Sequence, residues 1–503
     1  MTVDPKTSQK TRHVDIPSTE IRTSSSAPAW NWVVLALVAM TVVGISYTIL
    51  QVSIPSEAKG GLACLLMLIL LLIKVPVAVA MGLSGGLGIL ALGGSTALTN
   101  TLGDLPYDAT ASFTLSVLPM FIFMGIMLWR SGVTSELYLA ARHWVGWLPG
   151  GLSVTTTVAG AGLASASGST IGITYALGRI GIPEMLRAGY DRRLAIGSVM
   201  VAGTIGQLIP PSIYAVVFAG FAEIAVGPQL LAGILPGILL TLVYALLIIG
   251  FVLMRPQLVS KRGREVIGSS TWRDRWEGLA SIWVLPALIV LVIGGLYLGV
   301  FTATEAGAVG SLGAVVIAAA RLGFKDFVKG VVDALRDTVA SVGSILFLLM
   351  GAAILNRLLA LSGAARWFAD VIEGAGLGRV GFICMLVLIY LVLGMFMEPI
   401  SMMLLTVPVL LPVAIAVGIE PMWYGVFFIL MAEISILTPP VGILVFITHR
   451  LAQDPEVRGD TQITLWDVFQ GALWFVPGAL FVVALITAFP AIVDFIPNLG
   501  AAK

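Results

Sequence analysis

The chain has 503 residues, of which 58% are apolar and only 11% are charged. Soluble globular proteins have about 25% charged residues, so this composition excludes a soluble protein and indicates an integral membrane protein. The net charge of +1 and the three scattered histidines offer no basic face for nucleic acid and no His-ligated metal site. Cys64 and Cys384 both lie in apolar runs, which excludes a disulfide framework.

The chain begins with a polar segment and a single apolar run. Residues 1–29 are rich in Ser, Thr and Pro and carry both charge signs, which predicts a disordered cytoplasmic tail. The run within 30–55 is too long for the core of a cleaved signal peptide and has no Ala-x-Ala site, so we expect an extra N-terminal membrane helix. Further apolar runs that can cross a membrane lie at about 61–73 with 75–93, 114–129, 194–222, 229–252, 282–300, 303–320, 338–360, 423–448 and 466–489.

Two apolar segments, at about 152–185 and 379–417, are interrupted midway. The interruptions are Ser165-Ala166-Ser167-Gly168-Ser169-Thr170 and Met397-Glu398-Pro399-Ile400-Ser401. Two half-length helices joined by a polar tip can enter and leave a membrane on one side, so both segments are predicted to be re-entrant helical hairpins.

The positive charges predict the orientation of the chain. With both hairpins re-entrant and the N-terminus in the cytoplasm, all but five of the 28 Lys and Arg residues lie on the cytoplasmic side. The exceptions are Lys59, Arg357, Arg366, Arg379 and Lys503. The positive-inside rule requires this asymmetry, so we expect the C-terminus outside.

The sequence contains an internal repeat. An offset of 229 residues aligns 169–211 with 398–440 without a gap, and both Pro210-Pro211 and Pro439-Pro440 fall on the same positions. The span count inverts the second half relative to the first, an arrangement typical of secondary transporters that bind substrate and ion near the midplane. The predicted division is 56–252 and 282–490 for the inverted repeats, 253–281 for a cytoplasmic linker and 491–503 for a C-terminal tail.

Each Pro-Pro pair should break its helix, at 194–222 and at 423–448, because proline lacks the N–H group and clashes with the preceding turn. Carbonyls freed before a break are hard oxygen ligands for a small cation, and N–H groups freed after it suit an anion. No Gly-x-x-x-x-Gly-Lys-[Ser/Thr] motif occurs, so transport is not expected to use ATP bound to this chain.

Polar groups at the hairpin tips need partners at membrane depth. A hydroxyl of Ser167, Ser169 or Thr170 either binds a ligand or bonds back to the preceding turn. Glu398 is either functional or a cap of the second half-helix, and Glu305 is open to the same two interpretations.

Several motifs together resemble the large membrane subunit of tripartite ATP-independent periplasmic (TRAP) transporters over about 60–490. They are Ser-Gly-Ser-Thr (167–170), Ile-Pro-Glu-Met (182–185), Gly-Tyr (189–190), Gly-Thr-x-Gly-x-Leu-Ile-Pro-Pro-Ser (203–212), Pro-Gly (236–237), Phe-Thr-Ala-Thr-Glu-Ala (301–306), Gly-Ile-Glu-Pro (418–421) and Leu-Thr-Pro-Pro-Val-Gly (437–442). The resemblance implies a sodium-driven elevator-type importer of carboxylates in the bacterial inner membrane, and not an enzyme. Its C-terminus would then be periplasmic.

The resemblance also implies site residues, at least two Na⁺ ions and two partners. The substrate residues would be Ser167, Gly168, Ser169, Thr170, Pro211, Ser212, Glu398, Pro440 and Gly442. The sodium residues would be Ser169, Gly203, Thr204, Gly206, Glu398, Ser435 and Thr438. The partners would be a periplasmic substrate-binding protein and a small membrane subunit. The family usually has Asp where this chain has Glu398, and one extra helix is too few for a fused four-helix small subunit, so that subunit is expected on a separate chain.

Two other functions are compatible with parts of the sequence. A stand-alone ion-coupled carboxylate transporter would share the architecture and would need no binding protein. A membrane-embedded hydrolase would use Ser167 or Ser169 as nucleophile, but no histidine lies nearby in the sequence to activate either one.

For the importer, the moving unit is expected to contain both hairpins and both broken helices, with 32–54, 229–252 and 466–489 in a static frame that docks the small subunit.

Overall fold

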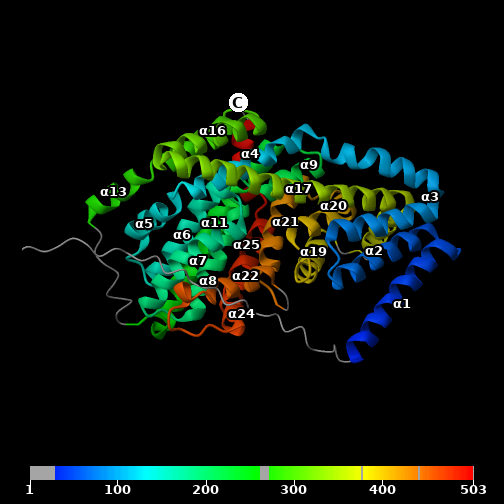
Figure 1. The fold of residues 1–503 in the computed structure, drawn as a ribbon, viewed down its shortest axis with the longest axis horizontal. Helices are drawn as coiled ribbons and strands as arrows, with labels where there is room; N and C mark the ends of the chain where they lie inside the picture. The colour runs from blue at the N-terminus through cyan, green and yellow to red at the C-terminus, as the bar shows by residue number, and fades with distance from the viewer. Residues whose placement is uncertain (1–28, 261–270, 375, 377, 440–441, 502–503) are drawn as a thin grey trace, which may run out of the picture.

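The computed structural model of the chain describes residues 29–260, 271–374, 376, 378–439 and 442–501 (Figure 1). These residues form helices throughout, apart from one isolated bridge between Tyr190 and Val259. Seven helical segments are long and apolar enough to cross a membrane, or eight if the bent pair 272–281 and 284–297 forms one span. The prediction of an all-α membrane protein is confirmed.

Helices from both halves of the chain pack around one long helix, α17 (Phe324–Ser362), and form a unit that we call the frame. It contains α2 (Ser56–Leu72), α3 (Val77–Thr110), α4 (Val117–Arg130), α16 (Ala303–Arg321) and α17 itself. In Figure 1, α17 runs lengthwise across the molecule, and it packs against α3 and α4. The preceding helix α1 (Ala29–Gln51) packs on α2 and α3.

Small residues and charges explain why α17 lies so close to its neighbours. A Cβ added at Gly85 of α3 would lie 2.9 Å from the Leu355 backbone, so the two helix backbones approach each other there, as small residues allow in membrane proteins. Arg130 pairs with Asp333 and Asp337 at 3.1 and 3.0 Å. These two acids lie in the first half of α17. This helix begins at Phe324, 14 residues before the predicted span 338–360.

The first interrupted segment is a tight helical hairpin. Helices α6 (Gly151–Ser167) and α7 (Thr170–Arg187) are joined by two residues. Gly168 ends α6 at φ +53°, a conformation that favours glycine, and Ser169 caps α7 by accepting a hydrogen bond from the Gly172 N–H at 3.2 Å.

The second interrupted segment has a similar build. Helices α19 (Gly378–Gly394) and α20 (Pro399–Ala416) flank a short tip, and Glu398 occupies the N-cap position of α20. The offset of 229 pairs Glu398 with Ser169 and Ser401 with Gly172. In both hairpins the third residue of the second helix donates a hydrogen bond to the side chain at the N-cap position. In the first hairpin the donor is the Gly172 N–H, and in the second it is the Ser401 hydroxyl, which donates to Glu398 Oε1 at 3.0 Å. The inverted orientation of the two halves in a membrane stays a prediction.

Both Pro-Pro segments interrupt their helices. The first consists of α8 (Arg192–Thr204), a 3₁₀ turn η2 (Ile205–Gln207) and α9 (Ile213–Phe221), with a cis bond between Pro210 and Pro211. The second consists of α21 (Pro421–Ser435) and α22 (Ile443–Ala452). Pro440, predicted at the second break, lies outside the described residues.

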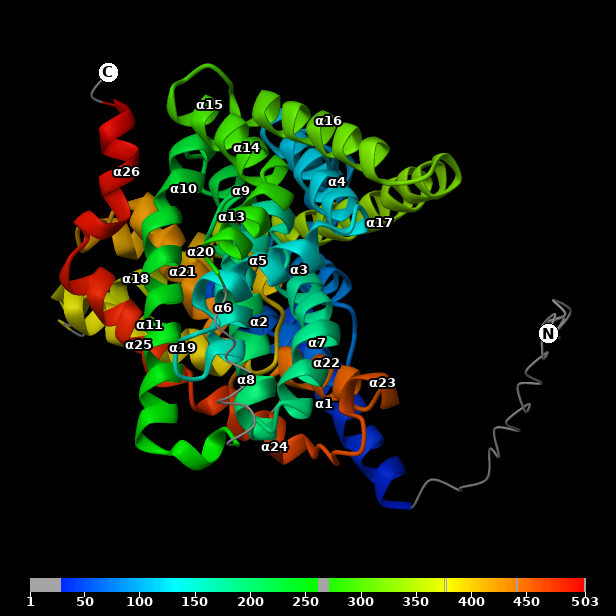
Figure 2. The ribbon, with the colours of Figure 1, turned by 90° about the vertical axis from the view of Figure 1, so that its left-hand side faces the viewer.

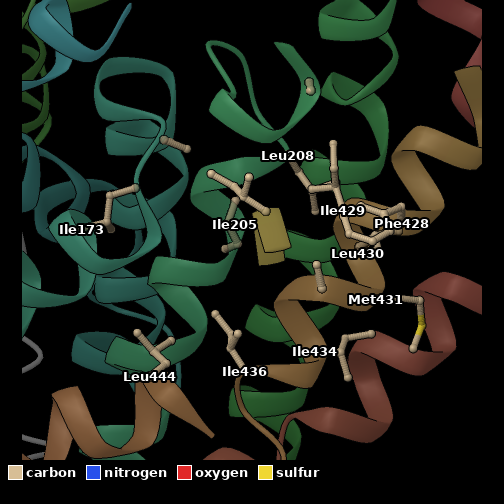
Figure 3. Packing of buried hydrophobic residues seen from close by; sticks show 14 of the residues in the cluster. Ile173, Ile205, Leu208, Phe428, Ile429, Leu430, Met431, Ile434, Ile436 and Leu444 are labelled. Carbon is tan, nitrogen blue, oxygen red and sulfur yellow. The ribbon is translucent and has the colours of Figure 1, made fainter. Parts of the chain in front are cut away.

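The hairpins and broken helices pack together into a second unit, which we call the body. Figure 3 shows buried side chains of α7, η2, α21 and α22 that belong to one hydrophobic cluster, including Ile173, Ile205, Ile434 and Leu444. The sequence assigned 229–252 and 466–489 to the frame, and the packing corrects this grouping. Helix α11 (Ile234–Met254) packs on α6, and α25 (Val476–Ala488) packs on α11 and α21.

Polar contacts and glycines explain that correction. Helix α24 (Leu465–Leu473) packs on α8, where a Cβ added at Gly197 would lie 2.5 Å from the Gly471 carbonyl oxygen. Asp467 pairs with Arg192 at 2.9 Å, and the Trp423 indole N–H of α21 donates to the Ile486 carbonyl of α25 at 2.9 Å. These contacts join both C-terminal helices to the broken helices.

Two outer segments are also helical. The predicted linker contains η3 (Pro256–Leu258) and α13 (Trp272–Ser281), and α13 packs on α5 (Val133–Val145). The predicted C-terminal tail forms α26 (Ala491–Ala501), which packs on α11 and α10 (Val226–Ala232), as Figure 2 shows.

The tip of the first hairpin provides a test of the fold. We expect Gly168→Ala to be strongly destabilising, because its left-handed backbone costs alanine about 1–2 kcal/mol and its Cβ would collide with the Pro211 carbonyl oxygen. Gly418→Ala is the matched control, since Gly418 has φ +79° but no atom within 4 Å of an added Cβ. Thermal unfolding of the purified variants should show a clearly larger loss for Gly168→Ala. Equal losses would contradict the close contact between tip and break.

Candidate transport site

A cavity of about 270 Å³ lies between the frame and the body. Its frame wall comes from α4 and α17, for example Ile126 and Ile345. Its body wall comes from the tip of the first hairpin and from the first broken helix, and Ile400 adds one side chain from the second hairpin. A solute in this cavity would therefore contact both units.

The tip of the first hairpin presents three polar residues to the cavity, and each hydroxyl has a different role. Ser167 Oγ is buried and has no hydrogen-bond partner among the described residues. Ser169 caps α7, and the Thr170 hydroxyl donates to Glu433 Oε1 at 2.6 Å. Of the three, the Ser167 hydroxyl is the one without a partner inside the described protein.

Gly168 does not line the cavity but holds the tip in place. An added Cβ there would collide with the Pro211 carbonyl oxygen, so only a glycine lets the hairpin tip rest on the first break. This contact joins two segments that the sequence predicted separately.

The first broken helix contributes Gln207, Ile213 and Tyr214 to the cavity. Ser212, predicted to bind substrate, caps α9 by accepting from the Ala215 N–H at 3.1 Å and is not among the described lining residues, so its substrate role stays a prediction. Gln207 and Tyr214 were missed in the sequence analysis. A glutamine inside an apolar helix next to Pro-Pro was a usable signal, because buried amides need partners, and the Tyr214 N–H donates to Gln207 Oε1 at 3.4 Å.

The beginnings of α7 and α9 both face this cavity, through Ile171, Gly172 and Tyr214 among others. Helix N-termini carry unpaired N–H groups and a partial positive charge, which favours anions. None of the described lining residues is charged. An anion bound here would be held by backbone groups and hydroxyls.

The predicted sodium residues of the first half lie where α8 meets α7. The Thr204 hydroxyl donates back to the Val201 carbonyl at 2.9 Å. A Cβ added at Gly203 would collide with Thr174 Oγ1 and lie 2.8 Å from the Thr170 carbonyl oxygen. At Gly206 it would lie 2.5 Å from Ile173 Cδ1. Both glycines therefore permit the close approach of break and hairpin.

The predicted sodium residues of the second half are arranged in a comparable way. Ser435 bonds back to the Ala432 carbonyl at 2.7 Å and Thr438 to the Ile434 and Ser435 carbonyls at 3.0 and 2.9 Å. Gly394 of the second hairpin rests against Ser435, since an added Cβ would collide with its hydroxyl. Glu398 and Gly442 are not among the described cavity residues.

Two further carboxylates have distinct surroundings. Glu305 forms a capping box with Thr302, so of the two interpretations left open by the sequence the structural one is correct. Glu433 is 1% exposed, and its bond from Thr170 joins α21 of the second half to α7 of the first. In the described parts of the chain no group of three His, Cys, Asp or Glu residues could hold a metal ion.

Comparison with known proteins identifies the family to which this chain belongs. Residues 64–492 match the family described as the tripartite ATP-independent periplasmic transporter, DctM component. The chain belongs to this family. The C4-dicarboxylate TRAP transporter large permease protein DctM of Vibrio cholerae is 30% identical over 412 residues, covering 77% of this chain and 86% of the relative. The resemblance drawn from the motifs is confirmed.

Other matches agree with a TRAP permease. The sialic acid TRAP transporter large permease protein SiaM of Vibrio cholerae is 28% identical over 413 residues, covering 82% of this chain and 92% of the relative. The solved YdaH transporter of Alcanivorax borkumensis has a TM-score of 0.55 at 18% identity, covering 86% of this chain and 99% of that one. At this identity the likeness concerns the fold. The TRAP relatives are named as permeases, and this chain is likewise a membrane permease subunit and not an enzyme.

The frame wall of the cavity offers a direct test. Ile345→Trp enlarges a 6%-exposed side chain that lines the cavity, so we expect solute uptake to fall at least about tenfold, the effect of about 1.4 kcal/mol. Val339→Trp on the same helix is the control, because Val339 is 72% exposed and does not line the described cavity. Uptake into vesicles at equal expression would measure both. Equal uptake by the two variants would mean that solute does not use this cavity.

Proposed function

We propose that this TRAP permease is the transport subunit of a sodium-coupled importer of organic acids that works by an elevator movement. The observation that carries the proposal is the position of the cavity. It lies at the contact between frame and body, next to a hairpin tip, a helix break and two helix N-termini. A solute bound there would move with the body while the frame stays in the membrane.

The chemistry of the cavity suits an organic anion. Its described lining has hydroxyl, amide and backbone N–H groups and no charged side chain, so a carboxylate can be bound without selecting the rest of the molecule. The two relatives named above are permease proteins for C4-dicarboxylates and for sialic acid. We assign the choice of substrate to the binding protein, as one permease framework serves such different compounds.

Sodium is the proposed coupling ion. Each helix break meets a hairpin at a close glycine contact that includes oxygen atoms. Gly203 lies against the Thr174 hydroxyl and the Thr170 carbonyl, and Gly394 lies against the Ser435 hydroxyl. Such oxygen groups suit a hard cation, and two breaks support at least two Na⁺ ions. Residues 169, 203, 204, 206, 398, 435 and 438 remain the proposed ligands. Thr204, Ser435 and Thr438 use their protons for back-bonds, which leaves oxygen lone pairs available to an ion.

The remaining parts of the proposal concern assembly and orientation. We place the permease in the bacterial inner membrane with a cytoplasmic N-terminus and a periplasmic C-terminus. The matched family region begins at residue 64, after the extra helix α1. We propose that a small membrane subunit of about four helices, on a separate chain, assembles with this permease and that a periplasmic binding protein delivers the substrate.

The first experiment tests sodium coupling and the partners together. Uptake into vesicles that contain the permease, small subunit and binding protein should vanish when an inward sodium gradient is replaced by potassium. Undiminished uptake driven by protons alone would contradict sodium coupling. Equal uptake by the permease alone would instead support a stand-alone transporter.

The second experiment tests the elevator with a disulfide. After replacement of Cys64 and Cys384, the pair Thr114→Cys and Gly220→Cys should join the turn η1 (Phe113–Ser116) before α4 to α9 of the body, since a Cβ at Gly220 lies 3.6 Å from Thr114 Cγ2. We expect oxidation to block uptake and reduction to restore it.

A pair inside the frame serves as the control for this disulfide. Met120→Cys and Gly307→Cys join α4 to α16, where an added Cβ at Gly307 lies 3.1 Å from Met120 Cβ. Its oxidation should leave uptake intact. Full uptake with the Thr114–Gly220 crosslink in place would exclude relative movement of body and frame.

A further inference from the structure

Glu433 is an acidic side chain in an unusual place. It lies near the end of α21, two residues before Ser435, and is 1% exposed. Its Oε1 atom accepts the hydrogen bond from the Thr170 hydroxyl, and its Oε2 atom has no hydrogen-bond partner among the described residues. No ion pair of the described residues includes it. The offset of 229 pairs Glu433 with Thr204, so only one half of the repeat has an acid at this position.

The surroundings of Glu433 leave its charge and its Oε2 atom without compensation from the described residues. A buried carboxylate that lacks a cationic partner is costly, and acids inside membrane segments are by default functional. A proton on Oε1 could donate to the Thr170 hydroxyl, but Oε2 would still have no partner among the described residues. A small cation would instead neutralise the charge and coordinate Oε2.

A second unpartnered oxygen lies on the first hairpin, one helical turn after Thr170. Thr174 is 0% exposed, and its Oγ1 atom has no hydrogen-bond partner among the described residues. It follows Thr170 by one turn of α7, so both threonines share a face of the helix. Both also meet α8 at Gly203, where an added Cβ would collide with Thr174 Oγ1 and lie 2.8 Å from the Thr170 carbonyl oxygen.

We propose that Glu433, Thr170 and Thr174 form a buried site for a monovalent cation that joins the first hairpin to both broken helices. Its oxygen groups are a carboxylate, a hydroxyl and the Thr170 carbonyl, a set that suits a hard cation of single charge. The site adjoins the proposed sodium position at Gly203 and adds to it a charged group, Glu433, that the second half contributes to the first. It depends on the proposed sodium coupling only for the identity of the ion.

The site connects ion binding to the transport cavity through Thr170. Thr170 lines the cavity as the first residue of α7, but its hydroxyl points to Glu433 and is not available to the solute. A cation at Glu433 therefore holds the beginning of α7 and the hairpin tip in the geometry that forms the cavity wall. Cation binding thus prepares the solute site without contact between ion and solute.

Cation-induced stabilisation of the purified permease tests this site without transport. Thermal unfolding is followed during titration with NaCl, and separately with LiCl and KCl, at constant ionic strength. In Glu433→Gln, which keeps the shape but not the charge, and in Thr174→Val, the concentration for half-maximal stabilisation should rise at least about tenfold, because a ligand of a desolvated ion is lost. Thr174→Ser restores the oxygen and should restore the wild-type requirement.

Thr155→Val is the matched control. Thr155 is also 0% exposed with an unpartnered hydroxyl, but it lies on α6, the other arm of the hairpin. Its cation requirement should equal that of the wild type, which excludes a general effect of removing a buried hydroxyl.

The outcomes separate this site from the proposed sodium coupling. A wild-type cation curve in both Glu433→Gln and Thr174→Val would overturn the site, and Glu433 would then be a neutral structural acid. If Glu433→Gln does not fold, an unchanged curve in Thr174→Val alone overturns it. Stabilisation by another monovalent cation but not by sodium, lost in both variants, supports the site and contradicts sodium coupling. No stabilisation of the wild type by any of the three ions overturns both.

Discussion

The structure depends on the contact between the tip of the first hairpin and the break of the first broken helix. A backbone that leaves the helical path inside a membrane exposes N–H and C=O groups that lipid cannot satisfy, so it must lie against protein or a polar cavity. Here Gly168 rests on the Pro211 carbonyl, and the cap residues Ser169 and Ser212 each satisfy one N–H group in the first turn of α7 and α9. The same arrangement leaves two helix N-termini facing one cavity.

The two halves repeat this construction but use it differently. Ser169 and Glu398 both occupy the N-cap position of the second hairpin helix, and a glycine of each hairpin rests against a break. The cavity, however, takes its body wall mainly from the first half, with Ile400 from the second. The second half contributes a buried acid, Glu433, to the first. The two halves of the repeat therefore have unequal roles in the site.

The division into frame and body follows from how helices pack in a membrane. Because lipid removes most of the hydrophobic driving force between helices, close backbone approach at small residues and a few polar contacts decide which helices associate. Gly85 joins α3 to α17 in the frame, whereas Gly197, Gly471 and the Arg192–Asp467 ion pair join α24 to α8 in the body. The cavity lies between the frame and the body, and residues of both units line it.

The sequence by itself determined the class of protein, the two hairpins, the two broken helices and the family. These features are local, since they depend on apolar run length, on Pro210 and Pro211 lacking N–H groups and on polar tips such as Ser167 to Thr170. The tertiary structure decided the rest. It moved 229–252 and 466–489 from frame to body, brought Gln207 and Tyr214 into the cavity and turned the Thr170 hydroxyl toward Glu433. Apolar helices look alike in sequence whichever neighbour they pack on, and a hydrogen bond between residues 263 positions apart exists only once the two halves have come together.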